Sequence, residues 1–435
     1  MTSHRVVIVG GGAGGLELAT RLGDRCGKRG GMHVTLVDAT LTHLWKPLLH
    51  EVAAGTFDSH ENAVDYIAQA HRHHFKYRLG RMDGLDRERR EVRLAPTDDA
   101  DGRPLIPRRV VPYDTLVMAV GSVSHDFGIP GVREHCVFLD DRAQADALQQ
   151  VIMRNYIRAQ TQEAPVAQGQ LGIVIIGAGA TGVELAAELH HVARQLAARG
   201  FDRIVPERDV GITIIEAAGR LLPALPERLS SAAEKELRRL GVAVQTGKRV
   251  VRVIPEGVQT DDGMFHHAQL AIWAAGIKAP DFLRDIAGLE TNRLDQLMLR
   301  PTLQTTRDEN IFAIGDCAAL PLANSDRPVP PTAQAAHQQA ARLVKSLRCR
   351  IANKALPEFR YHDRGTLVSL SHYATVGNLM GNLTGSVMIE GRIARLTYRM
   401  LYRMHQRALH GIVPTGLLML SDLLQHRIRP RLKLH

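Results

Sequence analysis

Short apolar runs rich in valine, isoleucine and leucine recur along the chain, and most of them end at glycine or at an acidic residue. Such continuous runs are typical of strands that are buried on both faces of a parallel sheet. They lie at Arg5–Gly10, His33–Asp38, Asp114–Gly121, Gly172–Gly177, Val210–Glu216, Gln269–Gly276 and Ile311–Asp316. Helical patterns follow the first and the fourth run, at Gly15–Leu22 and Gly182–Ala198. The pattern therefore predicts an α/β fold with two Rossmann-like domains.

The first predicted helix follows a glycine-rich turn, Gly10-x-Gly12-x-x-Gly15. The first glycine permits the tight turn, the second lets the backbone approach a pyrophosphate, and the third lets the helix pack closely on the strand. The phosphates would lie at the helix N-terminus, where free N–H groups favour negative charge. Asp38 ends the next strand, at the place where an acidic residue binds ribose hydroxyls. The sequence therefore predicts a dinucleotide site here.

A second fingerprint, Gly177-x-Gly179-x-x-Gly182, has the same form, and Glu216 ends the strand that follows it. A carboxylate at Glu216 would accept hydrogen bonds from both ribose hydroxyls and repel a 2′-phosphate, so NADH is favoured over NADPH. Arg220 argues against this preference for NADH, because its guanidinium, if turned toward the nucleotide, would tolerate the 2′-phosphate of NADPH.

Glu184 lies in the first turn after the second set of glycines. Its position favours a role in orienting the hydride donor. The alternative is that its charge only stabilises the helix N-terminus through the macrodipole.

Two further strands complete a known signature. One ends at Gly121 and another at Gly315-Asp316. Together with the two fingerprints, they resemble the two-dinucleotide-binding-domain flavoproteins. The resemblance implies that the first site holds non-covalent FAD, with Asp316 on its ribityl chain. It also implies that the second site holds NADH as substrate, in a domain inserted within the FAD domain.

Four sequence blocks carry a closer resemblance: His43–Gly55, Trp273–Phe282, Pro330–Gln338 and Arg427–His435. They are similar to the bacterial type II NADH:quinone oxidoreductases. This family transfers a hydride from NADH to N5 of FAD and then reduces a membrane quinone by two electrons without pumping protons. The FAD-binding residues so implied are Gly10, Gly12, Gly14, Gly15, Asp38, Lys46, Pro47, Gly121, Asp316 and Ala333. The NADH-binding residues are Gly177, Gly179, Gly182, Glu216, Ala275 and Gly276.

The pattern Ala333-Gln334-x-x-x-Gln338 corresponds to the quinone-site motif of that family. Gln334 and Gln338 are one helical turn apart and share a face. Their amides are expected to bond the quinone carbonyl oxygens beside the flavin, with helix capping and core packing as the alternative. These two glutamines and Glu184 are the candidate catalytic residues.

The C-terminal part of the chain is basic, because only Glu390 and Asp422 are acidic from Gly385 on. The net charge of +10 suits an anionic partner, either nucleic acid or a lipid surface. Residues 392–410 read as an amphipathic helix, with arginines beside an apolar face, which favours an anionic lipid interface. Its apolar residues are Ile393, Leu396, Met400, Leu401 and Met404, and its arginines are Arg392, Arg395, Arg399 and Arg403.

A second apolar stretch, Leu417–Leu424, is short and contains Asp422. The arginines are concentrated on a helix with an apolar face, which argues against nucleic acid. Packing on the domains, or a homodimer interface, is the alternative for the apolar face.

A chain of 435 residues exceeds the size of a single core. The expected division is 1–165 for the first part of the FAD domain and 166–290 for the NADH domain. Residues 291–384 form the second part of the FAD domain with the quinone motif, and 385–435 form the membrane-docking segment. Neither a signal peptide nor a long apolar window is present. We therefore expect a peripheral protein on the cytoplasmic face of the bacterial plasma membrane.

The four cysteines, Cys26, Cys136, Cys317 and Cys349, are far apart in the sequence. A disulfide or thiol oxidoreductase needs a close pair. A sulfide:quinone oxidoreductase remains an alternative because its cysteines can be distant, although it needs no second fingerprint. An NAD(H)-dependent redox sensor is the other alternative. No metal site is predicted, since the one histidine-rich stretch has no matched cysteine or acidic partner.

Overall fold

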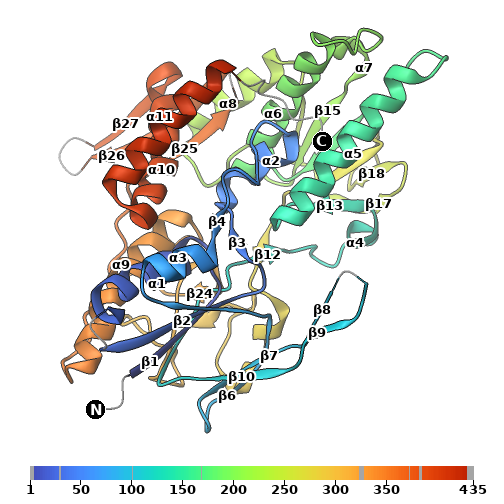
Figure 1. The fold of residues 1–435 in the computed structure, drawn as a ribbon. Coiled ribbons are helices and arrows are strands. Elements are labelled where there is room, and N and C mark those ends of the chain that lie inside the picture. Colours follow the sequence, from blue (N-terminus) through green and yellow to red (C-terminus); the bar gives the residue numbers. More distant parts are fainter. Residues whose placement is uncertain are drawn as a thin grey trace. The chain divides into compact units, whose positions relative to one another are not determined.

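The computed structural model describes residues 4–428 except 29–30, 100, 168, 323–327, 372 and 382–384 (Figure 1). The side chains at 374–399, 423 and 425–428 are also outside the described set. The chain forms two compact units. Unit 1 comprises Met1–Lys46, Asn62–Val123 and Ile277–His362, and unit 2 comprises Pro47–Glu61, Ser124–Gly276 and Asp363–His435.

Unit 1 is built on a parallel five-stranded sheet in the order β23-β11-β1-β2-β5. Its strands are β1 (His4–Val9), β2 (Met32–Asp38), β5 (Lys76–Leu79), β11 (Thr115–Met118) and β23 (Ile311–Ala313). Every residue of β11 is buried, as expected for a strand covered on both faces. The strand order reverses between β1 and β11. In α/β sheets, ligands bind at such a switch point, outside the carboxyl ends of the strands.

Three helices accompany this sheet: α1 (Ala13–Leu22), α3 (Tyr66–Arg72) and α9 (Ala333–Ile351), with α1 packed on α9. A smaller antiparallel sheet consists of β6 (Met82–Asp86), β7 (Glu91–Leu94) and β10 (Arg109–Pro112). The remaining strands of unit 1 are short: β3 (Thr42–His43), β4 (Val64–Asp65), β8 (Thr97–Asp98), β9 (Pro104–Ile106), β21 (Ile277–Lys278), β22 (Leu297–Met298) and β24 (Ala318–Ala319). Strand β12 (Val123–Ser124) lies where the chain passes into unit 2.

Unit 2 repeats the same plan, with a parallel sheet in the order β13-β20-β14-β15-β16. Its strands are β13 (Cys136–Phe138), β14 (Ile173–Ile176), β15 (Ile212–Glu216), β16 (Ala243–Thr246) and β20 (Leu270–Trp273). The switch point here is between β14 and β20. An antiparallel sheet adds β17 (Val250–Ile254), β18 (Gly257–Thr260) and β19 (Phe265–His267). The helices are α2 (Leu49–Ala54), α4 (Val132–His135), α5 (Arg142–Thr161), α6 (Ala180–Ala197), α7 (Pro206–Asp209) and α8 (Glu227–Arg239).

The C-terminal part of unit 2 is an antiparallel sheet followed by two helices. The strands are β25 (Gly365–Leu370), β26 (Ala374–Gly381) and β27 (Gly385–Glu390), and the helices are α10 (Gly391–His410) and α11 (Ile412–Ile428). Helix α10 covers the residues 392–410 that were expected to be helical. The side chains of its first part, Arg392, Ile393, Arg395, Leu396 and Arg399 included, lie outside the described residues, so its amphipathic character stays a prediction. The stretch Leu417–Leu424 is not a short segment, since it belongs to the 17-residue helix α11. None of the described helices combines the length and apolar composition needed to cross a membrane.

All seven predicted strands are confirmed, and both predicted helices begin two residues earlier than expected, at Ala13 and Ala180. The two compact units divide the chain differently from the expected domains. Strand β13 pairs with β20, which takes the chain from Ser124 onwards into unit 2, whereas the expected boundary was at 165. Each unit is assembled from three separate segments of the chain, and the insertion of an NADH domain within the FAD domain stays a prediction.

Candidate active site

The first fingerprint lies at the switch point of unit 1, and two of its glycines are required by the fold itself. Gly10 has φ +103°, and a Cβ there would lie 2.3 Å from the Ala119 carbonyl oxygen, just beyond β11. A Cβ at Gly15 would lie 1.9 Å from the Gly10 oxygen. Only glycine fits at these two positions, because any side chain would displace backbone.

Gly12 is different, since nothing in the fold explains why it is glycine. Its φ of −63° suits any residue, and no described atom lies within 4 Å of the place a Cβ would occupy. The open space is at the N-terminus of α1, where unpaired N–H groups favour an anion. This cradle therefore fits a pyrophosphate that approaches the backbone closely.

The second fingerprint has the same geometry in unit 2. Gly177 has φ +103°, with its would-be Cβ 2.7 Å from the Ala275 nitrogen beyond β20. A Cβ at Gly182 would lie 2.0 Å from the Gly177 oxygen. At Gly179, φ is −67° and again no described atom lies within 4 Å of a Cβ. The two units thus present two equivalent cradles, each at the switch point of its sheet. Gly276 follows Ala275 with φ +65°, and the Phe127 ring occupies the space of its Cβ.

The acidic residues that end the second strand of each unit are held by the fingerprint loops. Asp38 accepts a hydrogen bond from the Gly11 nitrogen (2.6 Å), and Glu216 accepts one from the Ala178 nitrogen (2.7 Å). The other Glu216 oxygen accepts from the Ala218 nitrogen (2.8 Å). A carboxylate has about four lone-pair sites, so both acids keep acceptor capacity for ribose hydroxyls.

Arg220, the residue that would admit a 2′-phosphate, is engaged within its own loop. Its guanidinium donates to the carbonyl oxygens of Leu225 and Pro223, both at 2.8 Å. The same loop is tied to the fingerprint, because the Leu222 nitrogen donates to the Ala178 oxygen (2.8 Å). These bonds hold the Arg220 guanidinium within its own loop, so it is not turned toward a 2′-phosphate. This favours the preference for NADH that was predicted from Glu216.

We predict that Glu216→Ser lowers kcat/KM for NADH about tenfold, because charged hydrogen bonds to the ribose contribute about 1.5–3 kcal/mol. Activity with NADPH should rise, since the charge that repels its phosphate is gone. Steady-state kinetics with both nucleotides measure the ratio. Arg220→Ala is the matched control and should lower thermal stability without admitting NADPH. An unchanged NADH/NADPH ratio in Glu216→Ser would contradict the assignment.

Asp316 belongs to a polar network in unit 1 that the sequence only partly predicted. Its carboxylate accepts from the Ser122 hydroxyl (2.7 Å), and its backbone oxygen accepts from the Gln296 amide (2.7 Å). Lys46 donates to the Ser122 carbonyl oxygen (2.9 Å), next to Gly121. Three predicted FAD-site residues are thus brought together by Ser122, which sequence reasoning missed because it carries no motif of its own.

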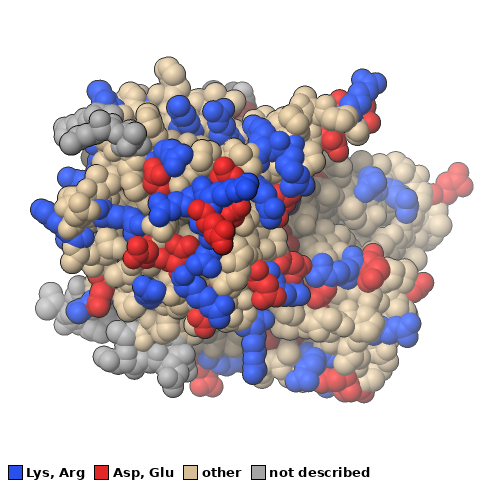
Figure 2. Space-filling view, turned by 90° about the horizontal axis from the view of Figure 1, so that it is seen from below, with Lys and Arg blue, Asp and Glu red and all other residues tan. Residues whose placement is uncertain are grey.

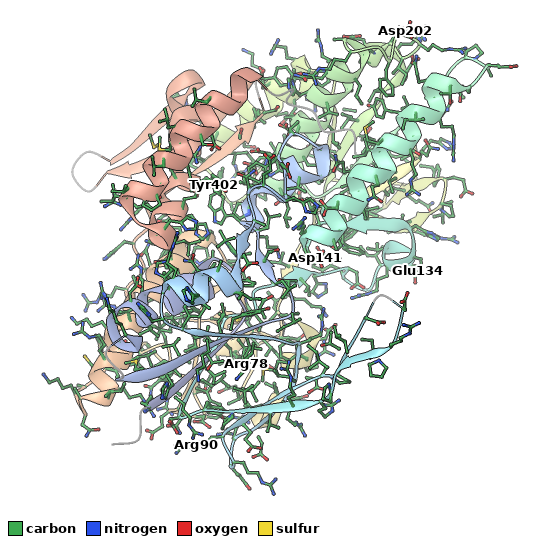
Figure 3. The ribbon with its side chains drawn as sticks, in the orientation of Figure 1. Arg78, Arg90, Glu134, Asp141, Asp202 and Tyr402 are labelled. Carbon is green, nitrogen blue, oxygen red and sulfur yellow. The ribbon has the colours of Figure 1, made fainter. Side chains whose placement is uncertain are left out.

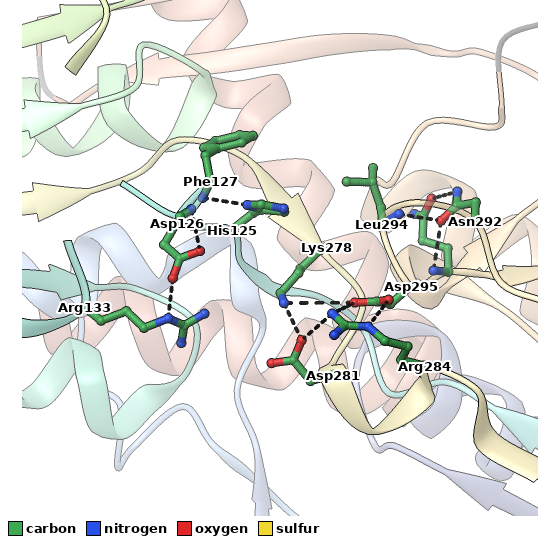
Figure 4. A network of polar contacts seen from close by, with 12 residues as sticks. His125, Asp126, Phe127, Arg133, Lys278, Asp281, Arg284, Asn292, Leu294 and Asp295 are labelled. Atoms are coloured by element: carbon green, nitrogen blue, oxygen red, sulfur yellow. Dashed lines mark hydrogen bonds and ion pairs between the residues drawn. The ribbon is translucent and has the colours of Figure 1, made fainter. Parts of the chain in front are cut away.

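An ion-pair network supports the Gln296 segment of this site (Figure 4). Arg284 holds the carboxylate of Asp295 with two bonds of 3.0 Å, and Lys278 lies 4.0 Å from the same carboxylate while pairing with Asp281. Because Asp295 directly precedes Gln296, the network fixes the segment that holds Asp316. The same figure shows unit 2 residues before β13, where the Phe127 nitrogen donates to His125.

Gln334 and Gln338 lie at the start of α9, after Ala333, and their amides meet at 3.3 Å as their spacing predicts. Gln338 also donates to the His362 oxygen (2.8 Å) and accepts from the His362 nitrogen (3.0 Å). It therefore holds the backbone of the segment after α9, a structural contact that differs from the helix capping or core packing expected as the alternative. Quinone binding by either glutamine stays a prediction.

Glu184 is buried in unit 2 and contacts residues that the sequence did not connect to it. One carboxylate oxygen accepts from the Ser369 nitrogen of β25 (2.9 Å), and the other lies 3.6 Å from Nδ1 of His50 on α2. Burial lowers the pKa of His50 to about 4, although the Pro47 carbonyl acts in the opposite direction. Glu184 is thus part of a packed polar cluster. Stabilisation of the helix N-terminus through the macrodipole, the alternative role, does not account for these contacts. Pro47 begins the segment that carries α2.

Comparisons with known proteins agree with this geometry. Residues 4–340 match the pyridine nucleotide-disulphide oxidoreductase family. The chain is 44% identical to a type II NADH:quinone oxidoreductase of Haemophilus influenzae, over 99% of both chains. The chain belongs to the type II NADH:quinone oxidoreductase family. A Staphylococcus aureus protein of this family is 28% identical over 87% of this chain and 90% of its own length.

Solved structures show that the fold is that of this family. NDH2 from Plasmodium falciparum, in complex with NADH, superposes with a TM-score of 0.80 at 18% identity and covers 99% of this chain and 100% of its own. A sulfide:quinone oxidoreductase from Aquifex aeolicus has a TM-score of 0.72 at 18% identity, covering 98% of this chain and 96% of its own. The fold alone therefore does not separate the two activities.

The cysteines distinguish this member from the disulfide enzymes that the broader family is named for. All four lie in the described part of the chain, and none of them forms a disulfide. Burial raises the pKa of both the Cys136 and the Cys317 thiol to about 12, so neither supplies a thiolate at neutral pH. Among the described residues, no group of three metal-ligating side chains is present.

Proposed function

We propose that this chain is an FAD-dependent NADH:quinone oxidoreductase that works as a peripheral protein on the cytoplasmic face of the bacterial membrane. The observation that carries the proposal is the pair of equivalent cradles at Gly12 and Gly179, in a chain of this family. FAD, when bound, supplies a ring that accepts a hydride and passes two electrons on. The protein supplies binding, orientation and exclusion of water.

The residues of unit 1 would hold FAD. The N-terminus of α1 binds the pyrophosphate beside Gly12, and Asp38 binds the ribose. Asp316 is oriented for the ribityl chain by Ser122 and Gln296. The carboxylate keeps acceptor capacity after the Ser122 bond, which is what a polyhydroxyl chain requires.

The residues of unit 2 would hold NADH. The N-terminus of α6 binds its pyrophosphate beside Gly179, and Glu216 binds the adenosine ribose. Ala275 and Gly276 follow β20 at the same switch point, with Ala275 packed on the core of unit 2. Glu184 lies one turn into α6, and we assign it to the reacting end of the nucleotide.

Steady-state oxidation of NADH with a short-chain quinone tests the proposal. The purified flavoprotein is expected to reduce the quinone with a kcat of about 10 s⁻¹ or more, as is ordinary for an enzyme of this kind. Slow turnover with bound flavin would support the redox-sensor alternative. Quinone reduction driven by sulfide in place of NADH would favour the sulfide:quinone alternative.

We predict different outcomes for the two glutamines. Gln334→Ala should raise the KM for quinone about tenfold, as expected for a lost hydrogen bond of about 1 kcal/mol or slightly more. Gln338→Ala should lower the melting temperature as well, because it removes both bonds to His362. Activity with ferricyanide, which needs no quinone site, is the control. If neither variant changes the quinone KM, both glutamines are structural.

The C-terminal helices supply the proposed attachment to anionic lipid. Large apolar side chains are exposed on both helices: Met400, Leu401, Met404, Ile412, Val413, Leu417, Leu418, Met419, Leu420 and Leu424. Soluble monomers rarely expose a set of this size without a partner. Tyr402 of α10 (Figure 3) packs edge-on against Phe57, with ring centroids 6.1 Å apart, so α10 is anchored to unit 2. The partner is a membrane, and a second copy of the chain is the alternative.

The charge distribution supports this choice of surface. On the face in Figure 2, acidic side chains lie among the basic ones, so that face offers lipid headgroups no unbroken basic area. In the C-terminal helices, Arg403 pairs with Asp422 and neutralises the acidic residue of α11. The pair lets α11 present its leucines without an uncompensated negative charge.

A further inference from the structure

A buried tyrosine of unit 1 holds a carbonyl group in the middle of the first fingerprint. The Tyr66 hydroxyl donates a hydrogen bond to the Gly11 oxygen (2.8 Å), and Tyr66 is 2% exposed. A Cβ at Gly11 would lie 2.3 Å from the hydroxyl oxygen. Gly11 does not have a positive φ, so its backbone conformation does not require glycine. It lacks a side chain because the phenol occupies that space.

Contacts with two other segments fix the phenol in this place. The Tyr66 nitrogen donates to the Leu41 oxygen (3.0 Å), just beyond the end of β2. The Tyr66 ring stacks on the ring of Tyr77 in β5, with the two centroids 5.2 Å apart. Burial raises the pKa of Tyr66, and the charge of Asp38 acts in the same direction. The hydroxyl is therefore protonated at neutral pH and remains a donor.

The bond to the Gly11 oxygen also sets the direction of the next N–H group. The peptide between Gly11 and Gly12 is planar and trans, so its C=O and its N–H point in opposite directions. Because the carbonyl is turned to the buried phenol, the Gly12 N–H points away from the phenol, and Gly12 itself is exposed. This N–H donates to no acceptor among the described residues. It is available to a phosphate oxygen at the N-terminus of α1.

Unit 2 holds the equivalent carbonyl with a different donor. Ala178 has the place of Gly11 in the second fingerprint, and its oxygen accepts a hydrogen bond from the Leu222 nitrogen (2.8 Å). Leu222 has φ +48°, so its loop keeps a left-handed residue while making this bond. A phenol in one unit and a backbone N–H in the other thus meet the same carbonyl. This recurrence indicates that the bond serves the cradle and is not a by-product of packing around one side chain.

We propose that Tyr66 is a positioning residue for FAD, whose hydroxyl aims the Gly12 N–H at the pyrophosphate. The role rests on the proposed function. Tyr66 does not touch the cofactor and acts only through the peptide between Gly11 and Gly12. Phenylalanine would fill the same space but would leave the buried Gly11 oxygen without its donor. The peptide would then be free to rotate, and its N–H would no longer be held toward the phosphate.

Tyr66→Phe tests this role in the intact holoenzyme. The dissociation constant of FAD, measured from the fluorescence of flavin released on dilution, should rise about tenfold, as expected for one hydrogen bond lost at a buried carbonyl. In the phosphorus NMR spectrum, a pyrophosphate resonance of the FAD that stays bound should shift, because the Gly12 N–H no longer meets its oxygen. The KM for NADH at saturating FAD should stay within a factor of about two, since the Leu222 bond still holds the second cradle.

Tyr113→Phe is the matched control. Tyr113 is a buried tyrosine of unit 1, and its hydroxyl has no hydrogen-bond partner among the described residues. Its removal should change neither the dissociation constant of FAD nor the phosphorus spectrum. A dissociation constant within about twofold of the wild type in Tyr66→Phe would overturn the role. Weaker binding with unshifted resonances would overturn it too, because the hydroxyl would then act through packing alone. If the wild-type protein binds no FAD, the proposed function fails instead.

Discussion

Gly179→Ala is expected to raise the KM for NADH about 100-fold while FAD content and melting temperature stay unchanged. Alanine fits the fold here, because φ is −67° and no described atom lies within 4 Å of the new methyl group. The methyl group enters the space where the pyrophosphate must approach the α6 N-terminus. A 100-fold loss corresponds to about 2.7 kcal/mol, which is reasonable for displaced charged hydrogen bonds.

The control variants distinguish a loss of NADH binding in Gly179→Ala from a loss of folding. Gly211→Ala, also at an uncrowded position but ahead of β15, should leave all kinetic constants unchanged. Gly12→Ala is the mirror variant and should lose FAD with no loss of stability. Flavin absorbance, NADH kinetics and thermal unfolding measure the three properties. A Gly179→Ala enzyme with an unchanged KM would show that NADH binds elsewhere.

The sequence predicted both cradles because their signals are local. Gly15 is required by a contact with Gly10 in its own strand–turn–helix unit, Gly10 has a positive φ in that turn, and Asp38 ends the second strand of the same unit. Buried parallel strands are equally local, since each is apolar over its whole length. This is why all seven predicted strands are present.

The residues that sequence reasoning missed are joined by contacts over long separations. Ser122 meets Asp316 across 194 positions, and Ser369 meets Glu184 across 185. Neither serine lies in a motif, and a single sequence carries no signal of such pairing. Gln338 is the opposite case. The quinone-site motif marked this residue as a candidate in the sequence, but its bonds to His362 depend on the path of the chain after α9, which the sequence does not show.

The length of helix α11 was underestimated for a different physical reason. Pro414 and Asp422 interrupt the apolar pattern from Ile412 on. The proline lies in the first turn, where a helix loses no hydrogen bond. The aspartate is paired with Arg403 of α10, a tertiary contact that compensates its charge.

Replacement of Leu417, Leu420 and Leu424 by serine is the variant expected to change membrane binding most. All three side chains are exposed on α11, at 63%, 56% and 55%. Transferring a leucine side chain from water to an apolar environment contributes about 1.5–3 kcal/mol. Losing three should weaken partition onto anionic vesicles by about 4 kcal/mol or more, roughly 1000-fold. Vesicle co-sedimentation at fixed salt measures the change.

The matched control removes exposed apolar side chains from parts of the chain outside the C-terminal helices. Leu105, Met264 and Leu294 are also exposed, and their serine variants should sediment with vesicles as the wild type does. Ferricyanide turnover should be unchanged in both triple variants, because neither touches the cradles. A membrane enzyme needs its acceptor within reach, so the α11 variant should lose turnover with a long-chain quinone in vesicles and keep it with a short-chain analogue. If the α11 variant stays on vesicles but changes from dimer to monomer in analytical ultracentrifugation, the leucines bind a second copy of the chain and lipid attachment lies elsewhere.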